Sequence, residues 1–138
     1  MTANEAVASL DAMVKNNIEN TEKVKWLLAL DGKYYLQMME PYSIQTDEDN
    51  TWHTAVVNAA HGQTVTVPAV LTEPMLIPYP FADIYETYLL SRLYLATSEP
   101  QRFAAASSMF EREWNALGSR IARSYKIRCE NRLHGGAT

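Results

Sequence analysis

Apolar residues recur every three or four positions near the start of the chain, which is the period of an amphipathic helix. Thr2 followed by Glu5 forms a capping-box pattern, so a first helix is expected over about residues 3–16. A second helix is expected over about residues 21–39, and Pro41 ends it. The apolar stripe of the second helix consists of Val24, Leu27, Leu30, Tyr34 and Met38.

The C-terminal half has the same helical period. A third helix with a broad apolar and aromatic face is expected over about residues 81–97. Ser98 and Gln101 form another capping box, which predicts a fourth helix over about residues 100–128. The core stripe predicted for the fourth helix consists of Phe103, Phe110, Trp114, Leu117 and Ile121.

The pattern changes between the second and third helices, over about residues 51–72. Thr64, Val65, Thr66 and Val67 are β-branched and alternate polar with apolar side chains, which is typical of a strand. The His61-Gly62 pair is expected at a turn, because glycine accepts positive φ without a steric cost. The sequence therefore predicts a β-hairpin inserted between the two pairs of helices.

The strand at residues 64–67 is expected at a sheet edge, because the following Pro68 has no N–H to donate to a ladder. The free backbone groups of an edge strand can pair with a neighbouring chain. Thr64, Val65, Thr66 and Val67 are therefore a candidate inter-subunit edge. A solvated hairpin that pairs with no other chain is an equally compatible interpretation.

The composition is that of one globular domain covering residues 1–138. Hydrophobic residues make up 47% of the chain, enough for one core without disulfides, and Cys129 has no second cysteine to pair with. We expect a mainly α fold, a four-helix protomer with the inserted hairpin and a flexible tail at residues 131–138. The sequence contains neither a membrane-spanning apolar run nor a signal-peptide pattern, so the cytosol is the expected site of synthesis.

Charge is distributed unevenly along the chain. The net charge is −4, but six basic and three acidic residues follow position 110, so that part carries +3 and the rest −7. The basic residues toward the C-terminus are Arg120, Arg123, Lys126, Arg128 and Arg132. Such residues can complement the dipole at the end of a solvated helix, pair with carboxylates of another protein, or contact DNA phosphates. The negative total disfavours a dedicated nucleic-acid binder.

Residues capable of catalysis or metal binding are not grouped in the sequence. His53, His61 and His134 lie far apart, and neither they nor Cys129 have the spacing of metal ligands. The five glycines fit no phosphate-binding loop, and the acidic run at residues 47–49 is typical of a solvated loop. We therefore expect no catalytic, metal or cofactor site, and no enzyme.

Two segments, taken together, resemble a known protein family. Residues 20–42 contain a W-L-x-x-L-D-G core, and residues 76–123 contain a Pro-x-Pro entry, an aromatic helix, a short polar turn and a helix rich in small and aromatic residues. This order resembles the head-to-tail connector (adaptor) proteins of long-tailed bacteriophages. The match covers about half of the chain. The N-terminal helix, Ala82 and residues 98–100 depart from the family pattern.

The resemblance implies a protein of the virion neck that is assembled in the host cytoplasm. Copies of the chain would form a ring, a dodecamer in this family, between the portal protein and a stopper or tail-completion protein. Viral DNA would pass through the channel without sequence-specific binding, and neither a cofactor nor a membrane is implied. In this family the C-terminal segment docks onto the portal, which would assign docking to the basic residues between Arg120 and Arg132.

Two other classes remain compatible with the residues. The first is another neck component, a stopper or a tail terminator, although such proteins are usually richer in β-strand. The second is a small helical DNA-binding regulator, which needs a recognition helix with exposed side chains that reach the bases. The helix predicted at residues 100–128 has most of its basic residues near its end, which disfavours this second class.

Overall fold

The fold is mainly α, as predicted. The computed structural model describes residues 1–66 and 71–136, with the side chains of the last helix described up to residue 125. The α-helices are α1 (Ala3–Met13), α2 (Asn20–Tyr34), α3 (Thr51–Ala60), α4 (Ile84–Ala96) and α5 (Pro100–Gly136). Shorter helical turns are the π-helical segment Tyr35–Met39 and the 3-10 turns Glu40–Tyr42 and Phe81–Asp83.

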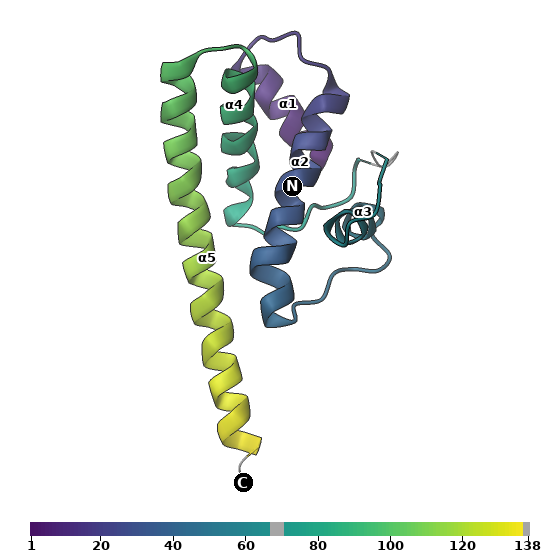
Figure 1. The fold of residues 1–138 in the computed structure, drawn as a ribbon, viewed down its shortest axis with the longest axis vertical. Coiled ribbons are helices and arrows are strands. Elements are labelled where there is room, and N and C mark those ends of the chain that lie inside the picture. The colour runs from purple at the N-terminus through teal and green to yellow at the C-terminus, as the bar shows by residue number, and fades with distance from the viewer. Residues whose placement is uncertain (67–70, 137–138) are drawn as a thin grey trace.

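Helices α4 and α5 form an antiparallel pair, and α1 and α2 pack beside α4 (Figure 1). Helix α3 lies beside α2 and is seen nearly end-on, so its axis crosses that of α2. Helix α5 continues past the end of the other helices toward the C-terminus (Figure 1). The molecule therefore consists of a small helical body and one helix that projects from it.

Helix α2 contributes the predicted stripe to the centre of the core. Val24, Leu27, Leu30 and Tyr34 are buried, and Met38 and Met39 of the following π-helical segment are buried as well. They join one hydrophobic cluster with residues of the other four α-helices and of the segment before α4. Full burial of one leucine or valine side chain contributes about 1.5–3 kcal/mol, so this cluster is the main source of stability.

The predicted β-hairpin is wrong. Residues Thr51–Ala60 form α3, and the side chain of Asn50 caps this helix by accepting a hydrogen bond from the backbone N–H of His53. The buried residues of α3 have helical spacing and are Trp52, Ala55 and Val56. Packing of this face against α2 outweighs the weak strand propensity of the segment, because propensity is a small term beside burial.

The His61-Gly62 pair ends α3 and does not form a hairpin tip. Gly62 has the positive φ that the sequence predicted, +83°, but uses it in the glycine position that follows a helix C-cap. Thr64, Val65 and Thr66 have no ladder partner, and the described residues contain no strand, so these three form no strand edge. Val67, the fourth residue of the predicted edge, lies outside the described residues.

Helix α5 has 37 residues and runs to Gly136, beyond the predicted end near residue 128. At a rise of 1.5 Å per residue it is about 55 Å long. Its predicted core stripe is buried to different degrees. Leu117 and Ile121 are buried, Phe110 and Trp114 pack against the core while partly exposed, and Phe103 is half-buried outside the core cluster. None of the described helices has the length and hydrophobicity needed to cross a bilayer.

Candidate functional site

The basic residues predicted for docking lie on the part of α5 that runs past α4. Arg120 and Arg123 are exposed. The Nε of Arg123 donates a hydrogen bond to the carbonyl of Ser119 at 3.4 Å, whereas Arg120 has no hydrogen-bond or ion-pair partner among the described residues. Lys126, Arg128 and Arg132 belong to the same helix, but their side chains lie outside the described part of the chain.

A cavity of about 340 Å³ opens beside Arg120. Its apolar lining comes from segments far apart in the sequence and includes Met39, Leu76, Pro78, Phe81, Leu117 and Ile121. The polar groups in its wall are Tyr34, Gln45, His53, Arg120, Ser124 and Tyr125. No Asp or Glu is among the described residues that line it. The cavity therefore combines apolar walls with one guanidinium and several hydrogen-bonding groups.

His53, at the start of α3, presents a buried polar atom without a partner. Its Nδ1 accepts a hydrogen bond from the backbone N–H of Asp47 at 3.1 Å, which assigns the proton of the neutral ring to Nε2. Nε2 is buried and has no hydrogen-bond partner among the described residues. Because an unsatisfied buried donor costs about 1–3 kcal/mol, such an atom calls for a specific explanation.

The walls of the cavity are positioned by Asp31, which is completely buried in α2. Its carboxylate accepts hydrogen bonds from Trp52 Nε1 at 2.6 Å, from the backbone N–H of Leu76 at 3.0 Å and from the Tyr85 hydroxyl at 2.5 Å. Burial raises the pKa of Asp31 to about 6, although the three hydrogen bonds each favour the charged form. One carboxylate thus connects α2 to α3, to α4 and to the segment before α4.

The segment before α4 is held at two successive backbone groups. Leu76 N–H donates to Asp31, and Ile77 N–H donates to the Tyr85 hydroxyl at 2.7 Å. Asp31 is the aspartate of the W-L-x-x-L-D-G core. In this chain its contacts are those of a buried structural residue, since its partners come from the protein's own helices and backbone.

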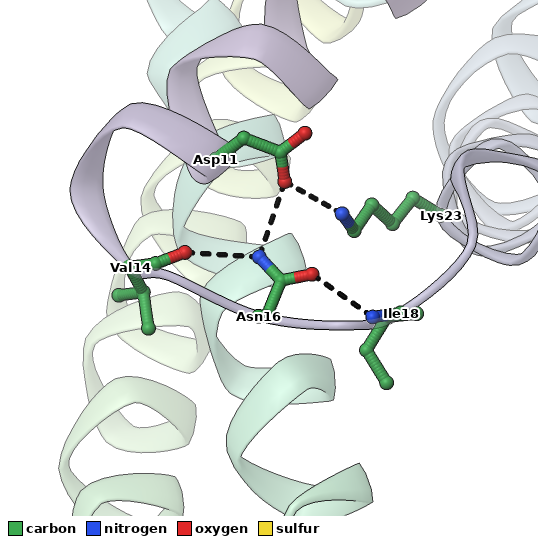
Figure 2. Close-up of polar contacts among 5 residues, drawn as sticks. All are labelled: Asp11, Val14, Asn16, Ile18 and Lys23. Atoms are coloured by element: carbon green, nitrogen blue, oxygen red, sulfur yellow. Dashed lines mark hydrogen bonds and ion pairs between the residues drawn. The ribbon is translucent and has the colours of Figure 1, made fainter.

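The connection between α1 and α2 is a second polar cluster, shown in Figure 2. Lys23 is buried, and its Nζ donates to Asp11 Oδ1 at 2.6 Å; this hydrogen bond lowers the pKa of Asp11. Asn16 Nδ2 donates to the same carboxylate oxygen and to the carbonyl of Val14, while its Oδ1 accepts from Ile18 N–H. These contacts attach the N-terminal helix, which departs from the adaptor pattern, to the rest of the core.

The sequence predicts Arg120 as a docking residue but gives no sign of the cavity beside it. It marks His53 only as an isolated histidine, and it does not predict the contacts of Asp31. No group of three His, Cys, Asp or Glu side chains that could hold a metal ion occurs in the part of the chain that the structure describes. No family model matches the chain, and no curated protein or solved structure is significantly similar to it.

Proposed function

We propose that the protein is a non-catalytic head-to-tail adaptor of a long-tailed bacteriophage, and that its copies form a ring between the portal protein and a stopper or tail-completion protein. The observation that carries the proposal is the shape of α5. This helix projects from the small helical body (Figure 1). Its exposed side chains include Arg120 and Arg123. A projecting helix can insert against a partner while the body packs against its neighbours in a ring.

The segments that resemble the adaptor family form neighbouring elements of the fold. Residues 20–42 make up α2 and the two short helical turns after it, and residues 76–123 include α4 and most of α5. The hydrogen bond between Asp31 and Tyr85 joins the two segments. The resemblance therefore concerns one packed unit, to which α1 and α3 are added. This arrangement supports the proposal.

The charge distribution also supports ring formation on a portal. Contacts around a closed ring are heterologous, so one face of each copy meets a different face of the next. A body with an excess of acidic residues and a basic C-terminal part offers complementary faces. We expect the chain alone to be monomeric or weakly associated, because the portal raises the effective concentration of docked copies.

The two alternative functions, another neck component and a DNA-binding regulator, are less well supported. Stoppers and tail terminators are usually rich in β-strand, whereas residues 1–66 and 71–136 contain none. A DNA-binding regulator would need a cationic surface that makes several phosphate contacts. Among the described α5 side chains, Arg120 and Arg123 are exposed beyond the end of α4, and α5 also carries Glu111 and Glu113.

The test is association with the portal protein encoded in the same genome. Size-exclusion chromatography with light scattering should show a small species for the protein alone and a ring-sized complex with portal. The double variant Arg120→Glu/Arg123→Glu should lose most of this association. The matched control Lys25→Glu/Lys33→Glu, which reverses two exposed charges on the body, should keep it. Tight rings without portal, or no binding to portal, would overturn the proposal.

A further inference from the structure

We infer that the cavity beside Arg120 is a binding site for a segment of a partner protein that presents an apolar side chain next to a carboxylate. The inference rests on the proposed function in one respect, because it assigns a partner chemistry to the basic part of α5. The experiment that tests the inference uses no virion component, so the cavity inference and the proposed function can fail separately.

The size and walls of the cavity favour an apolar side chain. At about 340 Å³, it lies within the range of pockets that bind small ligands and anchoring side chains. Leu76, Pro78 and Phe81 line it from the segment before α4, and Leu117 and Ile121 line it from α5. An apolar group that enters leaves water and meets these side chains, which is favourable without any directional contact.

The polar groups of the cavity favour an anion. Arg120 presents a guanidinium that no described residue pairs with, and guanidinium groups bind carboxylates through two parallel hydrogen bonds. His53 also lines the cavity; its Nδ1 accepts the hydrogen bond from Asp47 N–H, and its buried Nε2 has no hydrogen-bond partner among the described residues. Among the described residues, no acidic side chain lines the cavity, although acidic residues outnumber basic ones in the chain, 16 to 12. A cationic ligand would therefore find no counter-charge among these lining residues.

A second basic residue lies near the cavity, so the site can bind more than one carboxylate. This favours a protein segment over a small molecule with one acidic group. Arg123 lies one turn further along α5, exposed and within reach of a chain that leaves the cavity along the helix. Nucleic acid fits less well, because a strand is held through several phosphates and gains nothing from the apolar walls.

The cavity is already formed in the free chain. Asp31 fixes the backbone of Leu76, and Tyr85 fixes that of Ile77, while Leu117 and Ile121 are held in the core. Binding therefore requires little ordering of the walls, which is the condition under which few contacts suffice for measurable affinity.

The experiment is an NMR titration of the isotope-labelled full chain with three small probes that share one aromatic ring. Phenylacetate supplies a carboxylate, phenylacetamide is its neutral analogue, and phenethylammonium is a cation. We expect phenylacetate to shift the signals of the His53 ring and the Arg120 side chain saturably. The amide should bind at least tenfold more weakly, and the ammonium should leave these signals unchanged.

A second pair of probes tests the protein-segment part of the inference. The blocked peptide Ser-Glu-Leu-Ser should compete with phenylacetate, and the same peptide with Gln in place of Glu should bind at least fivefold more weakly. Arg120→Gln and His53→Leu should each weaken phenylacetate at least fivefold. Arg112→Gln, an exposed α5 control that does not line the cavity, should leave its affinity unchanged. Unchanged backbone signals away from the cavity show that each variant is folded.

The outcomes separate the two proposals. Equal binding of the ammonium, shifts confined to other residues, or an Arg120→Gln variant that binds like wild type overturns the inference. Binding of phenylacetate without either peptide overturns the assignment to a protein segment. If the protein binds phenylacetate but does not associate with the portal, only the proposed function is overturned. Portal association that survives in a protein with no probe binding overturns the cavity inference alone.

Discussion

The hydroxyl of Tyr85 in α4 donates a hydrogen bond to Asp31 in α2 and accepts one from the backbone N–H of Ile77. Both Tyr85 and Asp31 are completely buried. The burial raises the pKa of Tyr85 well above its ordinary value, so the hydroxyl keeps its proton and acts as a donor at every physiological pH. One oxygen atom thus links two helices and the segment between residues 76 and 78 that lines the cavity.

Removing this hydroxyl should destabilise the protein. The Tyr85→Phe variant leaves Ile77 N–H and one carboxylate lone pair unsatisfied in the core, which should cost about 1–3 kcal/mol. Urea unfolding followed by circular dichroism measures the change. Tyr79→Phe is the matched control, because Tyr79 is 67% exposed and its substitution should change stability by less than about 0.5 kcal/mol. Equal effects of the two substitutions would contradict the structure.

Stability should decrease as the pH rises from about 4 to about 6. Burial raises the pKa of Asp31 from 3.8 to about 6, so in this window the folded protein holds a proton that the unfolded chain has released. Two pH units correspond to about 3 kcal/mol of unfolding free energy. Comparison with Asp31→Asn at each pH removes the contributions of other carboxylates. A constant difference between the two proteins, or a midpoint near 4 in an NMR titration of the Asp31 carboxyl, would refute the expectation.

The sequence predicted four of the helices because each has a continuous apolar stripe and clear end signals, such as Thr2 before α1 and Pro41 after α2. It failed at α3, although Asn50 and the spacing of Trp52, Ala55 and Val56 are helix signals. The neighbouring β-branched run and Gly62 indicated a hairpin more strongly. A glycine with positive φ serves a hairpin turn and a helix end equally well, so it could not decide between them.

The candidate site was predictable only where its residues share one helix. Arg120 and Arg123 are neighbours on α5, so their common surface follows from sequence spacing. The cavity is different, because its walls come from α2, α3, α5 and the segment before α4. No periodicity brings His53 near Arg120, since their approach depends on the packing of whole helices. The site therefore required the three-dimensional structure.

The two residues of the Lys23–Asp11 ion pair should differ in their sensitivity to substitution, because only Lys23 is buried. Asp11→Asn leaves the Lys23 ammonium, only 2% exposed, without its charged partner, and should cost about 1–3 kcal/mol. Lys23→Met removes the buried charge and leaves Asp11, which is 42% exposed, in contact with water. We expect this second variant to lose less than about 1 kcal/mol. Urea unfolding of both variants measures the order, and a reversed order would contradict the burial of Lys23.

Two glycines should respond oppositely to alanine. Gly62→Ala should destabilise the protein by about 1 kcal/mol, because its φ of +83° lies in the left-handed region that residues with a Cβ rarely adopt. Gly32→Ala should stabilise α2 by up to about 1 kcal/mol, because an added Cβ meets no atom within 4 Å. Thermal unfolding distinguishes the two signs. A loss of stability in Gly32→Ala would show that close packing requires the glycine of the W-L-x-x-L-D-G core.

The contacts of Asp31 also have a consequence for folding kinetics. Trp52, Leu76 and Tyr85 lie 21, 45 and 54 positions away from it along the chain. Chain entropy must be lost to bring such distant groups together before any of these bonds can form. We expect the carboxylate to remain hydrated in the transition state and to be desolvated only afterwards. In stopped-flow measurements, Tyr85→Phe should therefore accelerate unfolding while leaving the refolding rate nearly unchanged.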